Sequence, residues 1–128
     1  MTENATDEQR IDAARAYLDA LVSHDGTAVP LAEKAVRIEA GLKTGFSGNH
    51  IRRSLTRGPQ FRVIGGIREL ECVAKPGVIE THYLLDTNVF GLNLVVAEIS
   101  ELFFIPEDGL IHRIEAKIKP RLGPSLRR

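Results

Sequence analysis

The segment of residues 110–119 constrains the fold most, because its apolar and charged residues alternate with a period of two. Such alternation predicts a β-strand with one face against a core and the other face in water. The packed face would carry Leu110, His112, Ile114, Ala116 and Ile118, and the solvated face Arg113, Glu115, Lys117 and Lys119. We expect Pro120 to end the strand, since proline cannot donate to a ladder.

Three more long strands are expected before this one, and together the four would form an antiparallel meander. The Asp108-Gly109 pair is typical of a hairpin turn, and Gly65-Gly66 indicates a bulge or sharp bend inside a strand. The expected strands are residues 61–72, 78–86 and 91–105, with turns at residues 75–77 and 106–109.

The N-terminal half of the chain has a helical character instead. Ile11, Ala14, Leu18 and Leu21 recur at three- and four-residue spacings, which predicts an amphipathic helix over residues 7–23. Gly26 suits a left-handed stop after it. We further expect a short helix at residues 29–34, a short strand at 35–39, a loop at 43–49 and a helix at 49–57. Helices followed by an antiparallel meander define the α+β class. We predict a curved antiparallel sheet with N-terminal helices, and the family resemblance described below implies that the sheet is cone-shaped and encloses a pocket.

The composition narrows the classes of function. The 128 residues suit one domain, expected over residues 1–120, with a basic flexible tail at 121–128. Acidic and basic residues balance at 17 each, so we expect neither nucleic acid nor a membrane as a partner. The polar start of the chain lacks the apolar core of a signal peptide, which favours a cytoplasmic protein. The four histidines have no metal-ligand spacing, and Cys72 is the single cysteine, so we expect no metal site.

The alternation of side chains between the two faces of the expected strand 91–105 gives the most informative candidate for a catalytic residue. Glu101 falls in the apolar row Asn93, Val95, Ala97, Ile99, Glu101, Phe103 and Ile105. A carboxyl group in such a row would be desolvated, its pKa would rise, and in protonated form it could donate a hydrogen bond to a developing oxyanion. Two alternatives stay open, a bulge that turns Glu101 to solvent and an ion pair with a cation such as Arg113.

Two further side chains are candidates for the same pocket. Tyr17 lies in the apolar stripe of the first helix, where its hydroxyl is either a proton donor to a cavity or the partner of one structural hydrogen bond. Glu39 ends a short strand beside Ala40-Gly41 and is placed to reach into a cleft, or else to pair with Arg37 or Lys43. The side chains expected to line the pocket for a ligand are Val95, Ala97, Ile99, Phe103, His112 and Ile114.

Three runs resemble nuclear-transport-factor-2-like proteins, a group that includes ketosteroid isomerases, SnoaL-type polyketide cyclases and limonene epoxide hydrolases. The runs are YLDALVSHD at residues 17–25, LAEKAVRIE at 31–39 and ELFFI at 101–105 before Asp108-Gly109. The ketosteroid isomerase pattern would put the oxyanion-binding tyrosine at Tyr17, the proton-shuttling carboxylate at Glu39 and the protonated carboxylic acid at Glu101. Both acids are glutamates here, one methylene longer than the aspartates of the isomerases.

The resemblance implies a function as well as a fold. It implies cofactor-free proton transfer on a small apolar carbonyl or polycyclic molecule, with Glu39 as base and with Tyr17 and Glu101 stabilising the oxyanion. It also implies a homodimer that pairs through the outer face of the sheet. The alternative is a non-catalytic module of the same fold that binds an apolar ligand or serves in assembly. Convergence of the three polar side chains on one cavity would favour the enzyme.

Overall fold

The computed structural model describes residues 4–58, 61–87 and 95–122, with residues 95, 121 and 122 described by their backbone only. Two helices pack on one six-stranded sheet whose strand order is β2-β1-β6-β5-β4-β3. The helices are α1 (Asp7–Ser23) and α2 (Gly48–Arg57), and the strands are β1 (Leu31–Glu39), β2 (Leu42–Gly45), β3 (Ile64–Lys75), β4 (Val78–Thr87), β5 (Val95–Phe104) and β6 (Ile111–Leu122). β1 runs parallel to β6, and all other neighbouring strands are antiparallel.

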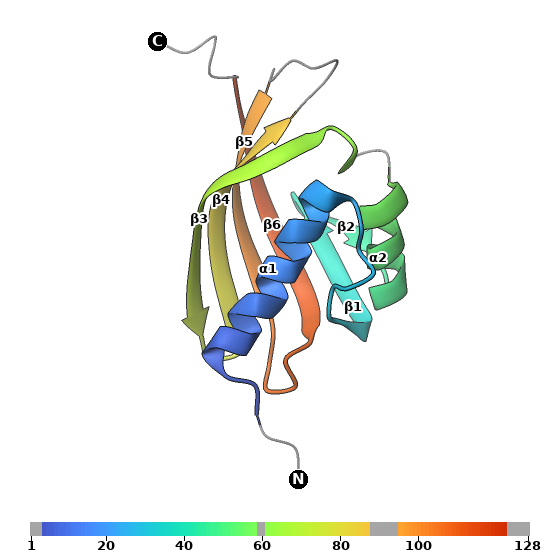
Figure 1. The fold of residues 1–128 in the computed structure, drawn as a ribbon, viewed down its shortest axis with the longest axis vertical. Coiled ribbons are helices and arrows are strands. Elements are labelled where there is room, and N and C mark those ends of the chain that lie inside the picture. The colour runs from blue at the N-terminus through green and yellow to red at the C-terminus, as the bar shows by residue number, and fades with distance from the viewer. Residues whose placement is uncertain (1–3, 59–60, 88–94, 123–128) are drawn as a thin grey trace.

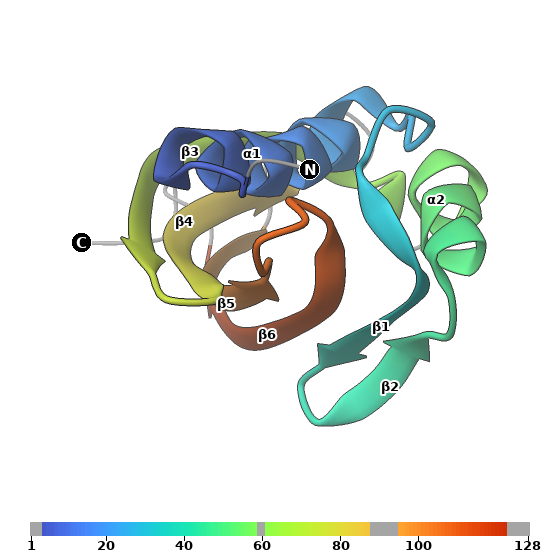
Figure 2. The ribbon, with the colours of Figure 1, turned by 90° about the horizontal axis from the view of Figure 1, so that it is seen from below.

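The sheet is strongly curved. In Figure 1 the helix α1 crosses its inner face, and Figure 2 shows β3 to β6 curling beneath α1 while α2 and the β1–β2 hairpin stand to one side. The predicted α+β class with a curved, mostly antiparallel sheet and N-terminal helices is therefore confirmed. Within the described residues, neither helix is long and apolar enough to cross a membrane.

Helix α1 has the predicted bounds, and its start is fixed by side-chain capping. The Thr6 hydroxyl accepts from the Gln9 backbone N–H at 3.1 Å, and the Gln9 side chain accepts from the Thr6 N–H at 2.8 Å. The expected stop at Gly26 is wrong, because His24 adopts the left-handed conformation (φ 61°) and its N–H bonds to Ala20. The helix buries the face that carries Tyr17.

Two predictions on the N-terminal half are wrong. Residues 29–34 were expected as a helix, but β1 begins at Leu31, which pairs with Ile111 of β6. Residues 43–49 were expected as a loop, but β2 occupies Leu42–Gly45 and folds back on β1 through a tight turn with positive φ at Ala40 and Gly41. In both places pairing with a distant or adjacent strand overrides the local preference. The predicted helix at residues 49–57 is present as α2, one residue longer.

The C-terminal meander follows the prediction in outline. The ladder of β3 shifts register between Ile64 and Gly66, where the glycine pair indicated a bulge. The turns close at Gly77 and Gly109, both with positive φ. The expected end of the last strand at Pro120 is wrong, since β6 continues to Leu122. Pro120 is tolerated because β1 pairs with β6 only as far as Ala116, so beyond it that side of β6 faces none of the described strands. Residues 123–128 of the expected tail, and 91–94 of the expected third strand, lie outside the described residues.

A buried arginine closes the end of the core near the N-terminus. Arg10 is 6% exposed, and its guanidinium donates to the carbonyls of Ile105 at 2.7 Å and Lys75 at 2.6 Å. It also bonds to the exposed carboxylate of Asp7 at 3.1 Å. Arg10 thus ties α1 to the ends of β3 and β5 by donating to one main-chain carbonyl at each of them.

Replacing Arg10 by methionine should therefore lower stability. Arg10→Met keeps much of the side-chain volume but removes both hydrogen bonds, including the buried one to Ile105, so the free energy of unfolding should fall by about 2–3 kcal/mol. Urea denaturation measures the change. Arg15→Met, at an exposed position of the same helix, is the matched control and should change stability by less than about 0.5 kcal/mol. Equal stability of the two variants would contradict the role assigned to Arg10.

Candidate functional site

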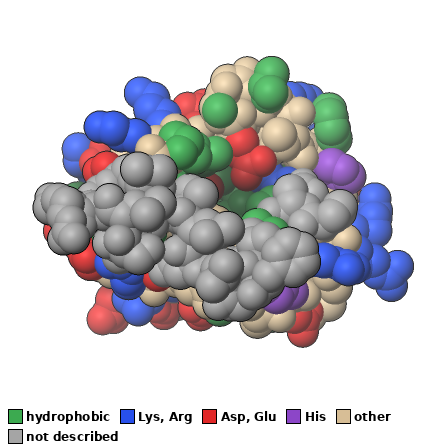
Figure 3. Space-filling model, turned by 90° about the horizontal axis from the view of Figure 1, so that it is seen from above, with side chains coloured by type: hydrophobic (Ala, Val, Ile, Leu, Met, Phe, Trp, Pro, Cys, Tyr) green, Lys and Arg blue, Asp and Glu red, His purple; other side chains and the backbone are tan. Residues whose placement is uncertain are grey.

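A cavity of about 270 Å³ lies between α1 and the inner face of the curved sheet. Two tyrosines and two glutamates line it, namely Tyr17, Tyr83, Glu39 and Glu101, together with Thr87, and most of its wall is apolar. The apolar wall includes Leu21, Phe61, Ile64, Leu85, Ile99 and Ile118. Viewed from above, acidic and hydrophobic side chains meet around a hollow at the end of the molecule opposite the N-terminus (Figure 3).

Glu101 points into this cavity, as its strand parity predicts. Ala97, Ile99 and Phe103 of the same row of β5 are buried, and Glu101 itself is only 3% exposed. The Tyr83 hydroxyl, from the neighbouring strand β4, donates to Glu101 Oε1 at 2.5 Å. Burial raises the pKa of Glu101 to about 7, a rise that the Tyr83 hydrogen bond and Arg37 oppose and that Glu39 increases. The carboxyl group of Glu101 therefore changes its protonation near neutral pH.

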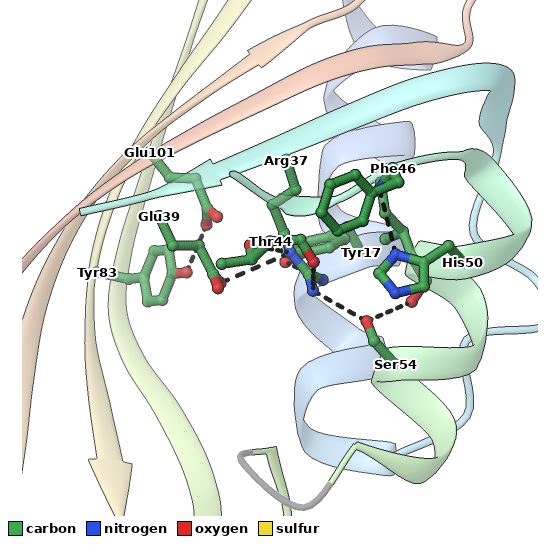
Figure 4. A network of polar contacts seen from close by, with 10 residues as sticks. Tyr17, Arg37, Glu39, Thr44, Phe46, His50, Ser54, Tyr83 and Glu101 are labelled. Atoms are coloured by element: carbon green, nitrogen blue, oxygen red, sulfur yellow. Dashed lines mark hydrogen bonds and ion pairs between the residues drawn. The ribbon is translucent and has the colours of Figure 1, made fainter. Parts of the chain in front are cut away.

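Glu39 and Tyr17 approach the cavity from β1 and α1. The Glu39 side chain is 21% exposed, at the last residue of β1, and its Oε2 lies 3.8 Å from Nε of Arg37. The Tyr17 ring packs edge-on against Phe103 at 5.3 Å between centroids. Burial, followed by the charge of Glu101, raises the pKa of Tyr17 well above its ordinary value. Figure 4 shows Glu39, Tyr83 and Glu101 directed toward one another, with Tyr17 behind Arg37.

Arg37 is the buried cation of the site. Its side chain is 0% exposed and donates to the Thr44 hydroxyl at 3.1 Å, the Thr44 carbonyl at 3.1 Å and the Ser54 hydroxyl at 3.0 Å. A longer bond of 3.4 Å joins Nη1 to the Tyr17 hydroxyl, and the guanidinium lies over the Phe61 ring at 5.0 Å from its centroid. Arg37 thus links β1 to β2, α1 and α2 (Figure 4).

Sequence reasoning missed Arg37 and Tyr83 as site residues. The signal for Arg37 was present, because Ala35, Arg37 and Glu39 share one face of β1 just as Ile99, Glu101 and Phe103 share one face of β5. Tyr83 could not be assigned to a face from its own strand. Its orientation follows from the register of β4 with β5, where it pairs with Ile99.

The six residues expected to line the pocket for a ligand divide into three groups. Ile99 lines the cavity, whereas Ala97, Phe103 and Ile114 are buried in the core without lining it. The side chain of Val95 lies outside the described part of the structure. The expectation for His112 is wrong, because its ring is exposed and its Nε2 lies 2.7 Å from Oδ2 of Asp108. The reason is that β6 pairs with β5 only from Arg113 onward, so His112 precedes the ladder that fixes strand parity.

The outer face of the sheet carries a second depression, a groove of about 390 Å³. Its lining includes Glu71, Glu80, His82 and Lys117, all on the solvated side of their strands. Glu101 belongs to the linings of both, but the other glutamates of the groove, Glu71, Glu80 and Glu115, are not buried. Although the groove is larger, we therefore regard the inner cavity, where Tyr83 donates to the buried carboxyl group of Glu101, as the candidate site. No group of three or more His, Cys, Asp or Glu side chains in the described ranges is arranged to hold a metal ion.

Comparisons of the structure with solved structures define the class of protein. A cystatin-like-fold protein from Silicibacter pomeroyi is 18% identical, with a TM-score of 0.65 over 84% of this chain and 74% of that one. The epoxide hydrolase/cyclase-like enzyme SalBIII, described with pyran ring formation in the polyether salinomycin, is 12% identical. Its TM-score is 0.67 over 88% of this chain and 92% of that one. A SnoaL-like protein of unknown function from Burkholderia thailandensis is 13% identical, with a TM-score of 0.66 over 91% of this chain and 99% of that one.

These likenesses establish a SnoaL-like, cystatin-like fold, in agreement with the resemblance in the sequence. The chain belongs to the family DUF8021, a domain of unknown function whose model matches residues 3–118. No curated protein matches the sequence.

The raised pKa of Glu101 predicts a specific dependence of stability on pH. Between about pH 4.5, where the unfolded glutamate titrates, and about pH 7, the native state holds a proton that the unfolded chain has released. The stabilisation by this proton is complete below that window and is lost as the pH rises through it. The free energy of unfolding should therefore fall by about 3 kcal/mol across the window, relative to that of Glu101→Gln.

Urea denaturation at a series of pH values measures this difference. Glu33→Gln, at an exposed position of β1, is the control and should keep the pH dependence of the wild-type protein. Parallel curves for the wild-type protein and Glu101→Gln would show that Glu101 does not take up a proton on folding.

Proposed function

We propose that this protein is a cofactor-free enzyme that transfers protons on a small, uncharged, apolar carbonyl compound. The observation that carries the proposal is the convergence of Glu39, Tyr83 and Glu101 on one largely apolar cavity. Two carboxyl groups in different surroundings are suited to different tasks, one as a base and the other as a hydrogen-bond donor. Tyr17 lines the same cavity, which also supports the enzyme over a module that only binds a ligand.

In the proposed reaction Glu39 removes a proton from the carbon next to the carbonyl group. The electron pair of the broken C–H bond moves to the carbonyl oxygen and forms an enolate. Protonated Glu101, with Tyr83 bonded to its other side, donates a hydrogen bond to that oxygen as the charge develops. Glu39 then returns its proton to a different carbon, or to the same one, so that no cofactor or co-reactant is consumed.

The lining of the cavity favours an uncharged ligand. Arg37 does not line the cavity, and its guanidinium is engaged by Thr44, Ser54, Tyr17 and Glu39. An acidic ligand would thus bring a negative charge beside two carboxyl groups with no cation facing it among the described lining residues. The apolar wall favours a hydrocarbon body, and about 270 Å³ suits a compound of one or two rings.

One of the proteins that share the fold is compatible with a catalytic role. It is an epoxide hydrolase/cyclase-like enzyme, and chemistry on an uncharged oxygen-bearing ligand is compatible with the side chains found here. Fold alone does not decide function, so the proposal depends on the residues around the cavity.

Replacing Glu39 by glutamine should abolish proton transfer while sparing ligand binding. The amide keeps the shape of the side chain but cannot accept the proton, so the rate should fall by about 100- to 10,000-fold. Exchange of the α-hydrogens of 2-tetralone for solvent deuterium, followed by NMR, measures the rate. Glu33→Gln is the matched control on the same strand. Unchanged exchange in Glu39→Gln would reject Glu39 as base, and binding without exchange by the wild-type protein would favour a non-catalytic binding module.

A series of ligands on one skeleton tests the ligand class. We expect 2-tetralone to bind more tightly than tetralin, which leaves the polar groups unpaired, and more tightly than tetralin-2-carboxylate, which adds a buried negative charge. The acid should bind at least about tenfold more weakly than the ketone, a difference of about 1.4 kcal/mol. Titration calorimetry at about pH 6.0, where Glu101 holds its proton and the carboxylic acid of the third ligand is ionised, measures the three affinities. Preference for the acid would contradict the uncharged ligand.

A further inference from the structure

The two carboxyl groups of the cavity differ in their relation to Arg37. Oε2 of Glu39 lies 3.8 Å from the guanidinium, whereas Oε1 of Glu101 is bonded to the Tyr83 hydroxyl at 2.5 Å. The titratable and charged groups that face Glu101 are Tyr17 from α1, Arg37 and Glu39 from β1, and Tyr83 from β4. On the other side Glu101 pairs with Ala116 of β6, which carries no charge.

This asymmetry matters because both carboxyl groups share one poorly solvated cavity. Two carboxylates close together resist ionising at once, so the pair retains a proton to a higher pH than an isolated glutamate does. A neighbouring cation favours the ionised form of the carboxyl group nearest to it. The retained proton therefore resides on the carboxyl group farther from the cation.

We propose that Arg37 is a positioning residue that confines the shared proton of the two glutamates to Glu101 and leaves Glu39 as the carboxylate. This inference rests on the proposed function, since it explains how one site contains a base and an acid at the same pH. Arg37 acts through Glu39 and does not itself touch the ligand. The pKa of Glu101, raised by burial to about 7, agrees with a proton held there.

A purely structural role for Arg37 is the competing explanation, and Arg10 shows what such a role looks like. Arg10 is also buried and also donates to main-chain carbonyls, yet its single carboxylate partner, Asp7, is exposed and lines no part of the cavity. A variant of Arg10 therefore reports the general cost of removing a buried guanidinium. It serves as the matched control.

The experiment measures the protonated carboxyl groups of the ligand-free protein directly by infrared spectroscopy between pH 5 and 9. The carbonyl band of a protonated carboxyl group is assigned to Glu101 by its loss in Glu101→Gln. In Arg37→Gln a second protonated carboxyl group, that of Glu39, should appear on acidification at a pH about 1–3 units higher than in the wild-type protein. Adding Glu39→Gln to the Arg37→Gln variant should remove this second band. Arg37→Lys, which keeps the charge, and Arg10→Gln should both retain the single band of Glu101.

The pH profile of α-hydrogen exchange gives the second readout. In Arg37→Gln the acid limb of the profile should move to higher pH, because the base is protonated there, whereas a merely structural loss would lower the rate equally at all pH values. If the infrared bands of Arg37→Gln titrate as those of the wild-type protein do, the inference is overturned. Since the infrared bands do not depend on turnover, a protein that shows the second band but no exchange would overturn the proposed function alone.

A further variant keeps the inference testable if Arg37→Gln does not fold. In Glu39→Gln the charge of Arg37 loses its carboxylate partner, and the negative charge of Glu39, which favours the protonated form of Glu101, is removed. The infrared midpoint of Glu101 should then move to lower pH than in the wild-type protein. An unchanged midpoint would show that the two carboxyl groups are not coupled, and would reject the inference.

Discussion

The buried charge of Arg37 is the constraint around which this end of the molecule is organised. A cation removed from water must be compensated by hydrogen bonds and by a counter-charge, or the fold loses several kcal/mol. The compensation comes from Thr44 on β2, Ser54 on α2 and Glu39 on its own strand. The short β1–β2 hairpin and α2 therefore have a definite place against β1 in part because the guanidinium requires their oxygens.

The parts of the fold that local sequence determines were predictable. Helix α1 combines a capping box with an unbroken apolar stripe, so its bounds follow from residues that are close together in the chain. The hairpin turns at Gly77 and Gly109 follow from the need for positive φ. Glu101 was predictable for a similar reason, because strand parity alone places its carboxyl group in the apolar row of β5.

The parts that depend on pairing between distant segments were not predictable in the same way. Residues 31–34 have helix-forming side chains, but β1 begins there, with Leu31 paired to Ile111 of the parallel strand β6. His112 follows the period-two pattern of β6, yet it lies before the first pair with β5 and turns outward. Tyr83 enters the site through the register of β4 with β5, which no local pattern specifies. Arg37 is the exception, since the parity argument used for Glu101 applied equally to it.

The two buried arginines of the described structure illustrate how a site can be distinguished from a structural tie. Arg10 satisfies carbonyls at the closed end of the core, and its carboxylate partner lies in water. Arg37 lies beside a cavity that also holds two carboxyl groups and two tyrosines. A chain selected only for stability would do as well or better with apolar side chains there, because burying such a group of charges rarely gives a net gain. Burying Glu101 and Arg37 together beside Glu39 therefore supports the acid–base role that we propose for the cavity.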